Sequence, residues 1–263
     1  MPSVITIPDS DSFNWIIVPA TRCIQTVADG AKLSGLLQRS VSALAGQDAL
    51  LERLDAFLKL AGKHLPTEDV DAAAGPTWPQ LAKDLVASGL HEIHAPGIIA
   101  LWASLEVTVE DTATLILVNN SQALQDFVTL GLKPSKSWVT PLDEATARRV
   151  FNRFEQYSRE ARSISQAYAH ILHVLGVDIS VPTQVLEQLT ELNYVRNCIL
   201  HRGGIVDARV VQEAPQSGLS PGDVVRVTQE SYLRYYDAVG AFAHAILVGT
   251  LAGRHARYKP PVA

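Results

Sequence analysis

The apolar residues of this chain recur mainly at three- and four-residue steps, the period of a helix that buries one face. The clearest example is the stretch 186–207, which reads LEQLTELNYVRNCILHRGGIVD. Its apolar stripe consists of Leu189, Leu192, Val195 and Ile199. Gly203 and Gly204 follow, and glycine ends a helix readily because it adopts the left-handed conformation without a Cβ clash. We therefore predict a buried helix that ends at these two glycines.

The same period predicts further helices, so the expected fold class is all-α. They cover residues 31–62 with a break near Gly46, 81–90, 97–118, 140–175, 182–202 and 228–251. Pro96 precedes the third of these helices. Thr140 is the expected cap of the fourth, with Pro141 in its first turn, and Ser180 is the expected cap of the fifth.

Two runs rich in β-branched residues interrupt this helical pattern. They are residues 205–215 and 223–228, and the turn between them contains glycine and proline. Such runs are typical of a β-hairpin or of an extended loop, and we expect one of the two as an insertion between helices.

The first part of the chain differs in composition from the rest. Residues 1–30 show no sustained period, and residues 63–79 have the proline, glycine and alanine content of a linker. We therefore divide the chain into an N-terminal helical extension with its linker (1–78), a helical domain (79–255) and a loose tail (256–263).

Composition restricts the class of protein further. Apolar residues make up 47% of the 263 residues and charged residues 19%, which suits a packed core. We expect a cytoplasmic protein, because the chain shows neither a membrane-spanning apolar run nor a secretory signal, and two cysteines do not form a disulfide framework. The net charge of −5 argues against broad nucleic-acid binding but leaves room for a local basic groove.

Two pairs of histidines lie close together in the sequence, His91 with His94 and His170 with His173. The first pair lacks the four-residue step of a zinc-protease helix, and no cysteine or carboxylate partner is evident beside the second. We therefore expect neither a metal nor a cofactor. Cys198 falls on the helical stripe and is better explained as a small core residue than as a nucleophile.

Charged residues cluster on two of the predicted helices. Glu106 and Glu110 lie one turn apart, and a solvated stripe explains them better than a carboxylate site does. Five arginines fall within residues 148–162 and could form a phosphate-facing ridge, although a solvated face is the plainer interpretation. The chain has neither a glycine-rich phosphate loop nor a serine elbow.

Arg196 and His201 lie near the end of the helix described first. His201 alone among the eight histidines has an arginine five to seven positions before it. A plain alternative exists, because basic residues in a last helical turn are favoured by the helix dipole and Gly-Gly is an ordinary stop.

The hexamer RNCILH, residues 196–201, resembles the R-x4-6-H signature of HEPN-domain proteins. The resemblance extends over roughly residues 79–254, through the segments LWASLE, FNRF, RNCILHRGG and SYLRYY, and it leaves the first seventy-odd residues without a counterpart. It implies a helical bundle that forms a homodimer, with the Arg and His of both chains lining a cleft. Many members are metal-independent ribonucleases, often toxins or defence factors, whereas others only bind.

The resemblance implies a catalytic role for Arg196 and His201, supported by Asn197. Histidine can accept the proton of a ribose 2′-hydroxyl, and arginine can stabilise the charge on the phosphorane. We further expect Arg149, Arg153 and Arg202 to contact RNA. The expected partners are a second copy of the chain, RNA and a protein antitoxin, and no membrane.

The spacing sets a geometric condition on this site. In a regular helix Arg196 and His201 are about 140° apart around the axis, whereas Asn197 and His201 share a face. Either the last turn is distorted or two chains supply the site. The alternative function is a non-catalytic binding or assembly module, in which RNxxxH is a structural helix end at a dimer interface; a helical DNA-binding regulator ranks third.

Overall fold

The computed structural model describes residues 14–47, 78–133 and 138–252, together with residues 49, 52, 53, 56 and 135. These residues form an all-α structure, as the sequence predicts. The elements are α1 (Asn14–Ala45), α3 (Trp78–Ala87), α4 (His91–Asn119), α5 (Ser121–Thr129), α6 (Glu144–Arg159), α7 (Ile164–Val174), α8 (Thr183–Arg202), α9 (Ala208–Glu213), the 3-10 helix η1 (Pro215–Ser217) and α10 (Gln229–Ala252). The expected tail and residues 63–77 of the expected linker lie outside the described residues.

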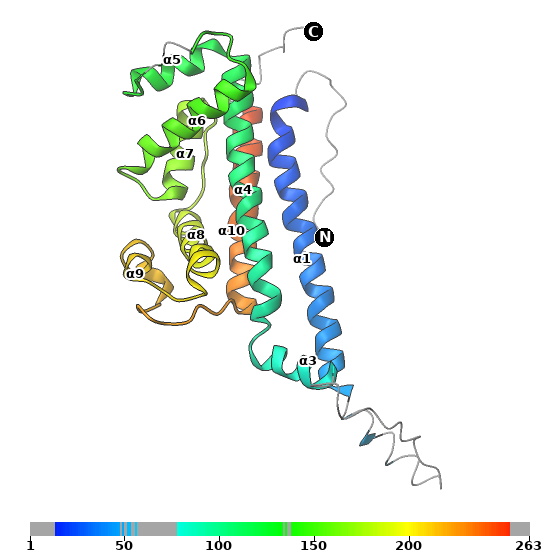
Figure 1. Ribbon diagram of the computed structural model, residues 1–263. Coiled ribbons are helices and arrows are strands. Elements are labelled where there is room, and N and C mark those ends of the chain that lie inside the picture. Colours follow the sequence, from blue (N-terminus) through cyan, green and yellow to red (C-terminus); the bar gives the residue numbers. More distant parts are fainter. Residues whose placement is uncertain are drawn as a thin grey trace.

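Helix α4 is the centre of the bundle. It contacts α1 and α10, which run beside it, and on its other side it contacts α6, α7 and α8 (Figure 1). Apolar residues occur around its whole circumference, as expected for a helix covered on several sides. Trp102, Leu105, Val109 and Ile116 are fully buried there. Across the described residues, no helix combines the length and apolar content that a membrane span requires.

Helix α1 begins well before the predicted start at residue 31. Pro19 lies inside it and obscured its period in the sequence. The side chains of Ile16, Ile17 and Ala20 are buried in the same apolar cluster as those of α4 and α10. Thr108 of α4 donates a 3.3 Å hydrogen bond to the carbonyl oxygen of Pro19, so packing against α4 supports this part of α1.

Helix α4 also begins earlier than predicted, at His91 rather than at residue 97, and contains Pro96. The two histidines of its first turn hold the segment that leads into α10. The backbone N–H of Val227 donates to His91 Nδ1 at 3.0 Å, and His94 Nδ1 lies 3.3 Å from the carbonyl oxygen of Val227. This pair of histidines therefore has a structural role.

The predicted helix 140–175 is two helices, and its predicted cap was wrong. Asp143, not Thr140, caps α6, because its side chain accepts a hydrogen bond from the Thr146 N–H at 2.6 Å. Ser163 then starts α7 with a reciprocal capping box that includes Gln166. Side-chain capping of this kind satisfies the free N–H groups of a new helix and so favours the break.

Helix α8 ends at the predicted glycines, with φ values of 60° at Gly203 and 83° at Gly204. Its start differs from the prediction, because the capping residue is Pro182 and no side chain caps the helix. Of the two forms expected for the insertion, a β-hairpin or an extended loop, the hairpin does not form, and part of the first run is helical. Residues 208–213 form α9, whose first turn is capped by Asp207, and the described pairing in this insertion is one isolated bridge, between residues 205 and 224. The side-chain cap of Asp207 favours the helix more than the β-branched residues Val210 and Val211 disfavour it.

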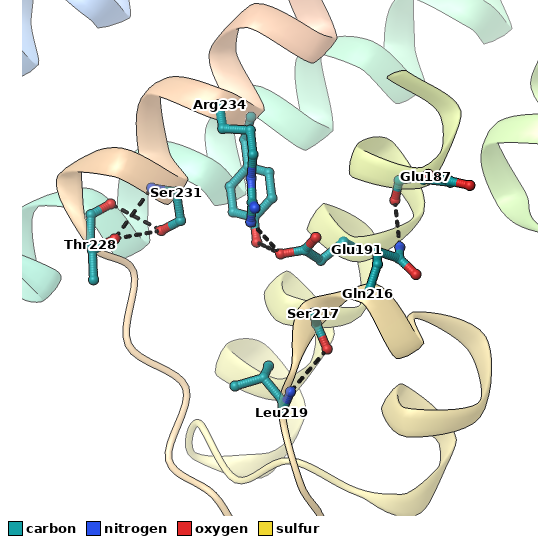
Figure 2. A network of polar contacts seen from close by, with 9 residues as sticks. Glu187, Glu191, Gln216, Ser217, Leu219, Thr228, Ser231 and Arg234 are labelled. Carbon is teal, nitrogen blue, oxygen red and sulfur yellow. Dashed lines mark hydrogen bonds and ion pairs between the residues drawn. The ribbon is translucent and has the colours of Figure 1, made fainter. Parts of the chain in front are cut away.

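Polar contacts fix α8 against its neighbours (Figure 2). The carboxylate of Glu191 is buried and accepts hydrogen bonds from Tyr235 Oη at 2.7 Å and from Arg234 Nη2, both on α10. Burial and the neighbouring carboxylate raise the pKa of the Tyr235 phenol above its ordinary range. Gln216 of η1 donates to the carbonyl oxygen of Glu187 at 3.0 Å. These contacts fix the N-terminal half of α8, the half that precedes the RNCILH segment.

Candidate functional site

A cleft of about 280 Å³ lies beside the C-terminal half of α8. Three helices contribute to its lining: α6 through Arg159, α8 through residues 193–202, and α9 through Arg209 and Val210. Asp207, the cap of α9, completes this wall. The insertion between α8 and α10 thus forms one side of the cleft.

Three polar residues of α8 line the cleft at steps of four: Asn193, Asn197 and His201. Residues at i and i+4 lie on one face of a helix, so they form a row. The row is graded in depth, since Asn193 is only 5% exposed, Asn197 is half-buried and His201 is exposed. Asn197 Nδ2 lies 3.5 Å from Asn193 Oδ1.

The charged lining of the cleft is mainly basic. Arg159, Arg202 and Arg209 line it, against the single carboxylate of Asp207. Asp207 forms an ion pair with Arg202, with 2.9 Å between Oδ2 and Nη2. A concave surface with excess positive charge attracts anions, even on a chain of net negative charge.

Arg196 does not line this cleft. Its Nη1 donates to Asn197 Oδ1 at 2.8 Å, and its Nη2 lies 3.6 Å from Glu106 Oε2 of α4. Its Nε is buried with no hydrogen-bond partner. Since α8 remains helical through Arg202, the last turn does not bring Arg196 to His201 within one chain. Arg196 instead holds the carboxamide of Asn197.

The arginines of α6 point in several directions, contrary to a single ridge. Arg148 pairs with Glu110 and Asp111, Arg149 donates to Thr146 Oγ1 at 3.0 Å, and Arg153 lies over the ring of Trp138 at 5.5 Å. Arg159, at the end of α6, is the one that lines the cleft. Of the three arginines that the sequence suggested for RNA contact, the cleft includes Arg202 and not Arg149 or Arg153.

The two carboxylates one turn apart on α4 are partly exposed and form separate ion pairs, not a joint site. Glu106 pairs with Arg196 and Glu110 with Arg148, at 3.6 and 3.1 Å. Each glutamate therefore ties α4 to a different helix.

Cys198 lies in the wall of the cleft and is only 2% exposed. Burial raises the pKa of its thiol, which lowers the amount of the nucleophilic thiolate. The prediction that Cys198 is a core residue is confirmed.

The second histidine pair does not converge on a common point. His173 Nδ1 lies 2.8 Å from Asp178 Oδ1 on the surface, a carboxylate partner that the sequence analysis missed, while burial lowers the pKa of His170. Within the described parts of the chain, no group of three or more His, Cys, Asp or Glu side chains is placed to hold a metal ion.

The cleft also includes Asn193, Arg159 and Arg209, none of which was among the predicted site residues. Arg159 had been noted only as one of five arginines that could form a phosphate-facing ridge. Asn193 carries a signal that could have found it, because it precedes Asn197 by the same four residues that separate Asn197 from His201. Arg159 and Arg209 come from other helices, and no local pattern links them to His201.

Comparisons of the chain with protein-family models, with curated proteins and with solved structures find no match. The likeness to HEPN-domain proteins therefore depends on the hexamer at residues 196–201 and on the order of the helices around it.

Proposed function

We propose that this protein is a metal-independent endoribonuclease of HEPN type, with His201 as the general base and Asn197 beside it. One observation carries the proposal: both side chains line a cleft that also presents three arginines. Cleavage of a phosphodiester next to a 2′-hydroxyl requires this combination, in which an imidazole that can accept a proton lies beside donors for the phosphate oxygens.

In the proposed reaction His201 removes the proton from a ribose 2′-hydroxyl, and the resulting oxygen attacks the adjacent phosphorus. A 2′,3′-cyclic phosphate forms as the bond from phosphorus to the 5′-oxygen breaks, and that oxygen takes a proton from water. A guanidinium neutralises the charge that builds on the phosphorane. No metal ion or cofactor takes part. A homodimer and a protein antitoxin are further expectations that the resemblance supplies, and a cytoplasmic location is the expectation from composition.

The test is cleavage of a mixed RNA substrate in EDTA by the wild-type protein and by His201→Ala. We expect cleavage products that end in 2′,3′-cyclic phosphate, and a loss of at least about 100-fold for His201→Ala, the usual contribution of a general base. His244→Ala, an exposed histidine of α10, is the matched control and should cleave like the wild type. If wild type and His201→Ala cleave equally, the assignment of His201 fails.

A second candidate function is a non-catalytic binding or assembly module. The engagement of Arg196 favours it, because the guanidinium is already used by Glu106 and Asn197 of its own chain. In that case RNxxxH serves as a helix end that orders the surface around the cleft. RNA binding without cleavage at any protein concentration would favour this module over the enzyme.

A further inference from the structure

We infer that Arg159 of α6 supplies the guanidinium that faces the phosphate, and that Arg196 is a positioning residue acting through Asn197. The inference rests on the proposed function and assigns roles within it. It makes the cleft of a single chain sufficient to bind one phosphodiester.

The first step is to ask which arginine can contact the phosphate while His201 contacts the neighbouring 2′-hydroxyl. A donor to the phosphorane must lie within hydrogen-bond distance of the phosphate while His201 reaches the neighbouring 2′-hydroxyl. Both side chains must then line the same cleft. Arg159 and His201 do so, from α6 and from α8, whereas Arg196 does not.

The second step compares the three arginines of the cleft. Arg202 is held by Asp207, which also caps α9 by accepting from the Val210 N–H at 3.1 Å, so this ion pair is part of the local fold. Arg209 lies on the six-residue helix α9, with its Nε 4.0 Å from Glu213. Arg202 and Arg209 are therefore both ion-paired with carboxylates of the insertion between α8 and α10.

Arg159 belongs instead to the bundle itself, as the last residue of α6. Its side chain is 46% exposed, and its Nη1 lies 3.5 Å from Glu155 Oε1, one turn earlier on the same helix. Glu155 does not line the cleft, and burial raises the pKa of its carboxyl. The guanidinium carries five N–H donors and a permanent charge, and its ion pair with Glu155 is made through Nη1, so an incoming phosphate can bind the rest of the guanidinium.

The third step concerns Arg196. Its Nη1 donates to Asn197 Oδ1, which directs the Nδ2 of that carboxamide along the row toward Asn193. Removing Arg196 should therefore disturb the orientation of Asn197 without removing a phosphate contact.

Binding is measured first, with a fluorescein-labelled 2′-O-methyl RNA dodecamer that lacks a free 2′-hydroxyl and cannot be cleaved. The variants are Arg159→Gln, Arg196→Gln and the matched control Arg162→Gln, which removes an exposed arginine three residues beyond Arg159 and outside the cleft. Anisotropy titrations at several salt concentrations give Kd and its salt dependence. Thermal unfolding of each variant confirms that it is folded.

We expect Arg159→Gln to raise Kd about 10-fold and to reduce the slope of log K against log salt by about 0.7, the contribution of one phosphate contact on a single strand. Arg159→Lys should restore most of the slope. Arg162→Gln and Arg196→Gln should leave the slope unchanged. On cleavable RNA, Arg196→Gln should lower kcat with little change in KM, as expected for a residue that positions another.

Three results would overturn the inference: a wild-type protein that does not bind the probe, equal effects of Arg159→Gln and Arg162→Gln, or a lower salt slope for Arg196→Gln. Other outcomes distinguish failure of this inference from failure of the proposed ribonuclease. If the probe binds through Arg159 but RNA is not cleaved in EDTA, the phosphate contact stands and the ribonuclease does not. If RNA is cleaved and Arg159→Gln behaves as the wild type, the ribonuclease stands and the role of Arg159 does not.

Discussion

Glu106 of α4 and Arg196 of α8 form an ion pair, with 3.6 Å between Oε2 and Nη2. Arg196 also donates to Asn197, so the pair connects the central helix to a residue of the cleft. The side chains are 38% and 21% exposed, and solvent therefore screens much of their attraction. We therefore expect this pair to add little to stability, in keeping with the positioning role proposed for Arg196.

A double-mutant cycle with Glu106→Gln and Arg196→Gln tests this relationship. We expect a coupling energy of about 0.5 kcal/mol, in the range of partly exposed pairs, from urea unfolding of the two single variants and the double variant. RNA cleavage by Glu106→Gln should fall more than its stability suggests, because Arg196 loses one of its two anchors. A coupling energy of zero, with full cleavage by Glu106→Gln, would contradict the positioning role.

The ion pair between the buried Glu191 and Arg234 (Figure 2) should contribute more to stability than the pair between Glu106 and Arg196. Glu191→Gln removes the charge that faces Arg234 and weakens the bond from Tyr235, and breaking such a pair costs about 2 kcal/mol when one partner is part-exposed. Glu187→Gln, one turn earlier and exposed, is the matched control and should change stability by less than about 0.5 kcal/mol. Urea unfolding measures both, and equal losses would show that burial of Glu191 is not the cause.

Local signals were enough for parts of this fold. The stop of α8 at Gly203 and the start of α10 after Thr228 were both predicted, because they depend on residues adjacent in sequence. The start of α1 was missed because it depends on tertiary support: Pro19 is tolerated where α4 packs against it. The break at Ser163 was also missed, although its capping box with Gln166 is a local signal.

The site was predictable only along one helix. The sequence named His201, Asn197 and Arg202, which all line the cleft, because they share the end of α8. It could not bring Arg159 to the same place, because α6 and α8 are placed through their contacts with α4 and α7, which no spacing in the sequence encodes. The resemblance also named both Arg196 and His201 as catalytic residues. The angle of about 140° between them around a regular helix already indicated that their side chains point in different directions.

Two glycines in long helices should respond in opposite ways to substitution by alanine. A Cβ at Gly249 of α10 would lie 2.5 Å from the carbonyl oxygen of Asp178, so the neighbouring turn would have to move. We expect Gly249→Ala to destabilise the protein by about 1–2 kcal/mol. A Cβ at Gly35 of α1 meets no atom within 4 Å, and Gly35→Ala should stabilise by about 0.5 kcal/mol through helix propensity.

Thermal unfolding of the two alanine variants provides the comparison, with the wild type measured alongside. The expected order of Tm is Gly35→Ala, wild type, Gly249→Ala. If Gly249→Ala were as stable as the wild type, the close approach of α10 to the turn at residue 178 would be wrong.

His94 should make stability depend on pH below neutrality. Burial lowers the pKa of His94 from its ordinary value near 6.5, and His91 adds to this, although the bond to the Val227 carbonyl acts in the opposite direction. That bond requires a proton on Nδ1. A second proton would go to Nε2, which is buried and has no hydrogen-bond partner. The folded protein therefore binds fewer protons than the unfolded chain just below pH 6.5, so this part of the stability is complete above pH 6.5 and declines as the pH falls.

His94→Gln keeps a donor for Val227 but cannot be protonated, and it should flatten this decline. The measurement is the free energy of unfolding in urea at pH 7.5 and 5.5 for the wild type, for His94→Gln and for His244→Gln, a substitution at an exposed position of α10. We expect a smaller loss of stability between the two pH values for His94→Gln than for the other two proteins. Because burial also lowers the pKa of His170, part of the decline should persist in His94→Gln. An identical decline in all three proteins would mean that His94 accepts its second proton as easily in the folded state as in the unfolded chain.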